Sequence, residues 1–253
     1  MKLGNIEYES LCGKVSAQEW QARIELAALY RLVPMYDWDD ESLTHASARV
    51  PGTNHFLFNP LGFLFEEITA SSLLKVDVDG RVLQDTPFEI TVEGWYPMKA
   101  VHTARQDANF VFHVHNVFGA AVGAQAGGLL PISQPACFAI ADGLAYHDYD
   151  GVETYESKIP SLQKSLGGAN RLILRNHGLL TLGETAELAF RRMFSLNRAC
   201  EIQIMAQAGG GELTTLSKDV LDTFPYEISR RQGNRSWPGI LRKLHRLSPD
   251  FAS

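Results

Sequence analysis

Residues 109–115, with the sequence NFVFHVH, restrict the fold of this chain more than any other segment. Their strict alternation and their β-branched and aromatic content are typical of a β-strand. The strand pattern ends in His113 and His115. A spacing of two residues on a strand directs both side chains to the same face. The segment therefore predicts a strand that carries two neighbouring imidazoles at its C-terminal end.

Strand and helix patterns alternate along the rest of the chain. Further strands are predicted at 55–58 and 171–175, and a hairpin is predicted over 75–83 around an Asp-Gly turn. No internal repeat, low-complexity tract or Pro/Ser-rich linker separates these segments. Because strands and helices interleave, we expect an α/β or α+β fold in one continuous domain over residues 1–253.

Four helices are predicted, over residues 16–33, 94–105, 117–125 and 185–208. In the first, apolar residues recur at helical spacing, and the third is a glycine- and alanine-rich segment. The first begins with the capping box Ser16-Ala-Gln-Glu19 and is expected to end at Pro34. The last is the longest and is closed by three consecutive glycines.

Composition excludes several classes of protein. Of the 253 residues, 45% are hydrophobic and 21% charged, which is a globular balance with enough apolar material for a core. The net charge of −6 argues against nucleic acid as a partner, because phosphate neutralisation needs a cationic surface. No apolar run approaches the roughly 20 residues that span a bilayer. Since the N-terminal segment also lacks the apolar core of a signal peptide, we expect a cytoplasmic protein with no membrane partner.

The three cysteines, Cys12, Cys137 and Cys200, lie far apart in the sequence and form no CxxC pair. An odd number with this spacing argues against a disulfide framework and against a zinc ribbon. Each is expected to be a small buried hydrophobic residue.

Three of the eight histidines indicate chemistry. His113 and His115 lie at the end of one predicted strand, and His177 follows another in an Asn-His-Gly turn. Two imidazoles on one face can hold a divalent ion, and a third from a neighbouring strand end would leave one position open for water or substrate. The alternative is that these rings only pack or form hydrogen bonds. His45, His55, His102, His147 and His245 are expected to be surface or hydrogen-bonding residues, and His45 precedes what we expect to be a polar loop with Ser47 and Arg49.

Four strings are distinctive: RQDANFVFHVH within 104–133, RNHGLL within 171–211, LTHASARVPG and HFLFNPLGF. In these strings the sequence resembles the class II aldolase and adducin family. Together they extend over residues 17–211, which leaves 212–253 as a C-terminal extension.

The resemblance implies a fold, an assembly and a metal. The family has a three-layer α/β/α fold with a central, mainly antiparallel sheet, and it forms homo-oligomers, commonly tetramers. The metal ligands of its aldolases match His113, His115 and His177 here. The ion is usually zinc, with manganese or cobalt in relatives.

The sequence departs from the sugar-phosphate aldolases at their catalytic glutamate. Alignment without gaps puts Gly94 at that position and Glu93 one residue earlier. We take Glu93 as the candidate catalytic proton shuttle, since a shift of one residue at a helix entry could still deliver it to the metal. Glu66 and Glu67 are interpreted instead as a solvated first helical turn.

A second departure concerns phosphate binding. The aldolases' Gly-Asn phosphate loop is replaced by Thr44-His45-Ala46-Ser47, and their Thr-Gly turn by Leu61-Gly62. In these respects the chain is more similar to adducin head domains and bacterial adducin-like proteins. Recognition of phosphate in the usual aldolase manner is therefore not expected.

Two functions remain open from the sequence. The first is a metal-dependent lyase that acts on a small hydroxy-carbonyl or carboxylate compound by stabilising an enediolate, in retro-aldol cleavage, decarboxylation or epimerisation. The alternative is a non-catalytic, oligomeric adducin-like binding or scaffold protein. An open coordination position beside Glu93 would favour the enzyme.

Overall fold

The computed structural model describes residues 6, 8–151, 156–230 and 236–253 of the chain. Its centre is a seven-stranded sheet in the order β3-β2-β1-β4-β7-β6-β5. Every neighbouring pair is antiparallel except β5 and β6. The strands are β1 His45–Arg49, β2 Phe56–Phe58, β3 Leu74–Val76, β4 Phe110–Val114, β5 Leu144–His147, β6 Arg171–Leu174 and β7 Gly178–Gly183.

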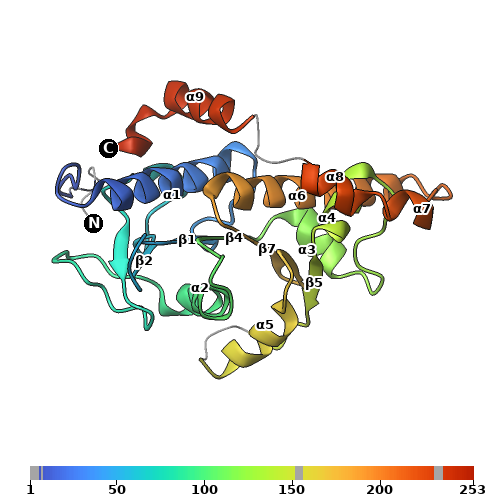
Figure 1. Cartoon of the computed structure of the whole chain (residues 1–253), viewed down its shortest axis with the longest axis horizontal. Helices are drawn as coiled ribbons and strands as arrows, with labels where there is room; N and C mark the ends of the chain where they lie inside the picture. The colour runs from blue at the N-terminus through green and yellow to red at the C-terminus, as the bar shows by residue number, and fades with distance from the viewer. Residues whose placement is uncertain (1–5, 7, 152–155, 231–235) are drawn as a thin grey trace.

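Helices cover both faces of this sheet (Figure 1). The described α-helices are α1 Ala17–Met35, α2 Val92–Ala104, α3 Val117–Gly123, α4 Gln134–Ala141, α5 Ile159–Leu166, α6 Ala186–Ala208, α7 Lys218–Leu221, α8 Phe224–Arg230 and α9 Trp237–Leu247. The short 3₁₀ helices are η1 Phe65–Glu67, η2 Glu156–Lys158 and η3 Pro249–Ala252. Helices α1 and α6 pack on one face, α2 and α5 on the other, and α9 lies on the outer side of α1. The expected three-layer α/β/α fold with a mainly antiparallel sheet is confirmed.

The two faces of the sheet have separate hydrophobic cores, because side chains alternate along each strand. On β4, Phe110, Phe112 and Val114 pack with α1 and α6, whereas Val111 packs with α2 and α5. His113 alternates with Phe112 and Val114, so its ring lies on the α2 side. The imidazoles of the predicted site thus emerge on the face that α2 and α5 cover.

Helix α1 begins as expected but ends differently. The hydroxyl of Ser16 accepts a hydrogen bond from the Glu19 N–H. The reciprocal half of the predicted capping box is wrong, because the Glu19 carboxylate pairs instead with Arg23 and Lys75. Pro34 does not end the helix, since one missing N–H donor leaves the turn intact and the helix closes at Tyr36.

The expected polar loop after His45 is wrong. Residues His45–Arg49 form strand β1, between β2 and β4 at the middle of the sheet. Its core-facing residues on the α1 side are Ala46 and Ala48. Two small alanines fill the space beneath α1 without the bulky alternation that marks a strand in sequence.

Cysteine burial is as expected for two of the three residues. Cys137 and Cys200 are buried, whereas Cys12 is exposed in the turn before α1, so the expectation for Cys12 is wrong. The predicted domain, core and extension boundaries stay predictions, and residues 1–5, 7, 152–155 and 231–235 of that domain lie outside the described chain. No helix in the described part is both long and apolar enough to cross a membrane.

Candidate metal centre

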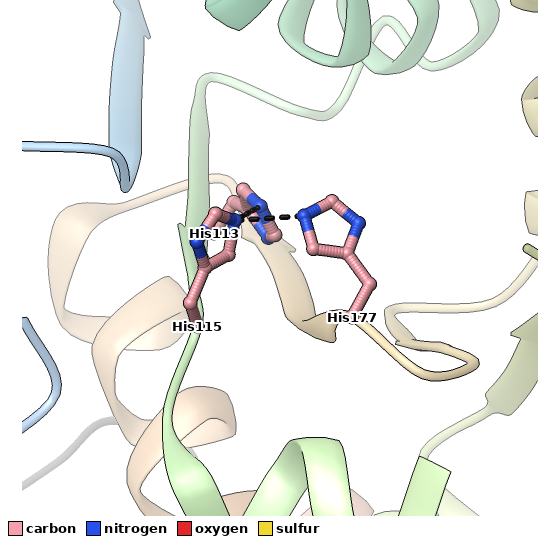
Figure 2. Close-up of side chains that lie close together, drawn as sticks. All are labelled: His113, His115 and His177. Atoms are coloured by element: carbon pink, nitrogen blue, oxygen red, sulfur yellow. Dashed lines mark hydrogen bonds between the residues drawn. The ribbon is translucent and has the colours of Figure 1, made fainter. Parts of the chain in front are cut away.

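The three predicted histidines come together at one end of strands β4 and β7. His113 is on β4, His115 lies directly after that strand, and His177 lies in the turn between β6 and β7. Antiparallel pairing sets Val114 opposite Leu179, so the end of β4 meets the start of β7. Figure 2 shows the three rings pointing toward one another.

The rings approach one another through the same type of atom. His115 Nε2 lies 2.9 Å from His113 Nε2 and 2.7 Å from His177 Nε2. One nitrogen from each residue lies within 4.8 Å of the others. Ligands of a tetrahedral zinc ion, at about 2.0–2.1 Å from the metal, are separated by about 3.3 Å. Small outward movements of the rings would therefore admit one ion.

Hydrogen bonds fix which nitrogen carries the proton in two of the rings. His113 Nδ1 lies 2.9 Å from the Leu179 carbonyl oxygen, and His115 Nδ1 lies 3.0 Å from a carboxylate oxygen of Asp40. Both oxygens only accept, so each Nδ1 is the donor, and in the neutral ring each Nε2 retains its lone pair. Two lone pairs that face each other at 2.9 Å repel unless a cation lies between them. This donor set fits a divalent transition metal.

Burial keeps the ring nitrogens available to a metal. It lowers the pKa of His177 to about 4, with a smaller contribution from the nearby His115. Burial also lowers the pKa of His113 well below its usual range, again assisted by the neighbouring histidines. Because a metal binds the neutral imidazole, these rings are ready for coordination at neutral pH. His177 Nδ1 is buried without a hydrogen-bond partner among the described residues.

Glu93 lies in the first turn of α2, where its side chain is exposed. Its carboxylate accepts a hydrogen bond of 3.2 Å from the Thr91 hydroxyl. In the described part of the chain, the group of ligand atoms within 4.8 Å contains the three histidines and not Glu93. The role of Glu93 stays a prediction. Glu66 and Glu67 are exposed in η1, consistent with a solvated turn.

Sequence reasoning missed two residues of the site. Asp40, which orients His115, comes from the loop between α1 and β1, and nothing in its spacing from the histidines marks it. The second is His45, which forms a hydrogen bond to Asn59, one of the two states expected for it, but is 8% exposed and stands opposite His113 on the neighbouring strand. His45, Ser47 and Arg49 alternate along β1, where a polar loop was expected. Recognising this two-residue period as a strand would have placed His45 in the sheet.

The sequence and the fold match known proteins. The family profile described as Class II Aldolase and Adducin N-terminal domain matches residues 24–204. The chain belongs to the class II aldolase and adducin family. A Pseudomonas aeruginosa protein, provisionally named an aldolase class 2 protein, is 46% identical over 245 residues, or 94% of each chain.

Two further comparisons cover both branches of the class II aldolase and adducin family. The crystal structure of an aldolase II superfamily protein from Pseudomonas syringae is 42% identical, with a TM-score of 0.89 over 97% of this chain and 100% of that chain. Alpha-adducin of Mus musculus is 41% identical over 215 residues, which are 83% of this chain but only 28% of the adducin.

Proposed function

We propose that the chain is a metal-dependent lyase of the class II aldolase type that acts on a small hydroxy-carbonyl or carboxylate compound. The observation that carries this proposal is the convergence of three imidazole Nε2 atoms, two of them held as bare lone pairs by partners on Nδ1. Those two lone pairs face each other at 2.9 Å, and the Nε2 of His177 lies 2.7 Å from that of His115. All three nitrogens therefore point to one place where a single ion could bind.

The ligands favour zinc. Three neutral imidazoles are typical of zinc sites that keep a fourth position open, and manganese or cobalt also accept them. When bound, such an ion supplies a Lewis acid for two neighbouring substrate oxygens, which suits retro-aldol cleavage, decarboxylation and epimerisation alike.

The protein's own residues hold the ligands in place. The Leu179 carbonyl fixes the ring of His113, and the Asp40 carboxylate fixes the ring of His115. Partners of this kind set the tautomer and orientation of metal-binding histidines. Glu93 is our candidate for proton transfer, from the first turn of the helix that covers this face of the sheet.

We also propose that the chain assembles into a homo-oligomer, with a tetramer favoured by the family resemblance. Large apolar side chains are exposed next to the site. Val117, which follows the β4 histidines, is 77% exposed, and Tyr149, whose ring lies 6.4 Å from that of His177, is 53% exposed. A second copy of the chain would cover them.

The alternative is a non-catalytic adducin-like binding protein. The observation that favours it is the exposed Glu93 carboxylate, bonded to Thr91 rather than to the histidines. In that case a bound metal would be structural. The two functions therefore differ in turnover, whether or not the adducin-like protein holds a metal.

Metal content tests the shared part of the proposal. Protein purified without added metal should hold about one divalent transition metal per chain, measured by elemental analysis. His177→Ala should lose it, since two imidazoles hold an ion much less firmly than three. His245→Ala, at an exposed position on α9, is the matched control and should retain it. Equal, negligible metal in the native protein and both variants would reject the site.

A substrate screen then separates the two functions. Zinc-loaded protein is incubated with hydroxy-ketones, ketose phosphates and β-keto acids, and the products are identified by mass spectrometry. Turnover that His177→Ala abolishes supports the lyase. A metal-loaded protein that converts none of these classes supports the adducin-like binding protein.

A further inference from the structure

His45 stands beside the three histidines but is not one of them. Strands β1 and β4 are antiparallel, and His45 lies directly opposite His113. Residues opposite each other in such a pair project to the same face, with Cβ atoms about 4.5–5.5 Å apart. The nitrogens of His45 lie outside the group whose ligand atoms are within 4.8 Å. His45 is therefore placed to contact a molecule bound at the histidines rather than the ion itself.

The hydrogen bond to Asn59 determines what His45 can offer. Asn59 Nδ2 donates to the Pro60 carbonyl, which turns the amide oxygen Oδ1 toward His45 Nδ1 at 3.2 Å. The hydroxyl of Tyr30 also lies 2.9 Å from that oxygen. An amide oxygen only accepts, so Nδ1 carries the proton of His45 and Nε2 holds a lone pair. Burial lowers the pKa of His45 to about 4, which leaves the ring neutral.

Gly94 gives the ring of His45 its space. A Cβ at residue 94 would lie 2.3, 2.5 and 2.8 Å from Nε2, Cδ2 and Cε1 of His45. These distances are nearly equal, so the missing Cβ would lie over the ring face and not in the ring plane. Gly94 therefore covers one face of the imidazole and leaves the in-plane lone pair uncovered. That lone pair has no hydrogen-bond partner among the described residues, although His45 is only 8% exposed.

We propose that His45 determines substrate specificity, with Nε2 accepting a hydrogen bond from a hydroxyl group of the compound held at the three histidines. This inference rests on the proposed function. A phosphate ester carries about −1.5 to −2 charges at neutral pH and offers acceptor oxygens. Facing an acceptor lone pair in a buried site, it would leave both groups unpaired. The site therefore selects an uncharged hydroxyl at this point over a phosphate.

Hydroxamates that chelate zinc provide the probes. Acetohydroxamate has no hydroxyl on its carbon chain, glycolohydroxamate has one, and 3-hydroxypropanohydroxamate extends its reach by one carbon. Their affinities for the zinc-loaded protein are measured by calorimetry, together with those of the phosphate esters of the last two. One hydrogen bond predicts that a hydroxyl probe binds roughly two- to tenfold more tightly than acetohydroxamate. The phosphate esters should bind more weakly than their parent hydroxyl probes.

Two variants assign this preference to His45. His45→Leu removes the acceptor, and Gly94→Ala displaces the ring because the new methyl group meets it. Both should bind all hydroxyl probes no better than acetohydroxamate while keeping their zinc. Gly168→Ala is the matched control, since a Cβ at that glycine meets nothing within 4 Å, and it should keep the preference. If His45→Leu does not fold, Gly94→Ala decides the question alone.

Each result has one meaning. A hydroxyl preference that both variants retain overturns the role of His45, as does tighter binding of a phosphate ester by the native protein. Equal binding of all hydroxamates by a zinc-loaded native protein overturns the inference and leaves the proposed function standing. A native protein that takes up no zinc overturns the proposed function and this inference with it.

Discussion

The Nδ1 atom of His115 lies 3.0 Å from the carboxylate of Asp40, although 75 positions separate the two residues in the chain. Asp40 is half-exposed at its side chain and comes from the loop before β1. The pair fixes the ring so that Nε2 faces His113 and His177. Partners of metal-binding histidines typically contribute a factor of about 10–100 to metal affinity.

Asp40→Ala should therefore weaken zinc binding by roughly 10- to 100-fold without removing a ligand. The measurement is a competition titration against a chromophoric zinc chelator. Asp39→Ala is the matched control, because the neighbouring Asp39 is exposed and lies one residue from the pair. Unchanged affinity in Asp40→Ala would show that the carboxylate does not orient His115.

Glu93→Gln should lower turnover by at least roughly 100-fold, because general acid–base groups typically contribute 10²–10⁴-fold. The amide cannot take a proton but keeps the shape of the side chain. Zinc content should not change, since three imidazoles hold the ion. Steady-state rates with the substrate found by the screen give the comparison. Glu89→Gln, at an exposed position shortly before α2, should have native rates. Native turnover in Glu93→Gln would remove Glu93 from the mechanism.

The stability of the fold should depend on pH through His102. His102 lies in the last turn of α2, and its ring is buried, with Ser47 donating to Nε2 and Nδ1 donating to the Ala108 carbonyl. Burial lowers its pKa from 6.5 to about 3. Between these values the unfolded chain binds the additional proton, so stability falls as the pH drops below about 6.5. From pH 7 to pH 5 this one group should lower the free energy of unfolding by about 2 kcal/mol.

Urea unfolding of His102→Gln at the two pH values measures that contribution. Between pH 7 and pH 5, the free energy of unfolding of the variant should fall by about 2 kcal/mol less than that of the native protein. His245→Gln is the control, because His245 is exposed on α9, and its pH dependence should match that of the native protein. The same slope in His102→Gln and the native protein would show that another group titrates.

Val117→Glu should dissociate the proposed homo-oligomer. A carboxylate at this 77% exposed position would be buried without a partner if a second copy covers it. Light scattering after size-exclusion chromatography should show an assembly for the native chain and a smaller particle for the variant. Leu83→Glu, at a 43% exposed position beside the edge strand β3, is the control and should assemble normally. A native protein of single-chain mass at micromolar concentration would contradict the proposal.

The sequence by itself determined the elements whose patterns are local. The alternation in 109–115 predicted β4, and the segment from Thr185 to the three closing glycines predicted α6. The pair His113 and His115 followed from the two-residue period of a strand. Such features depend on neighbouring residues only, so they can be predicted from the sequence.

Tertiary structure decided which distant residues share the site. It brought His177 to the β4 histidines through the pairing of β4 with β7, and it placed Asp40 on His115. It also placed His45 in the buried strand β1, with its ring against Gly94. This strand was not predicted, because Ala46 and Ala48 on its other face give no bulky alternating pattern. These contacts join residues tens of positions apart, and their distances are set by sheet register and helix packing. No local pattern encodes them, because each depends on how the whole sheet is assembled and covered.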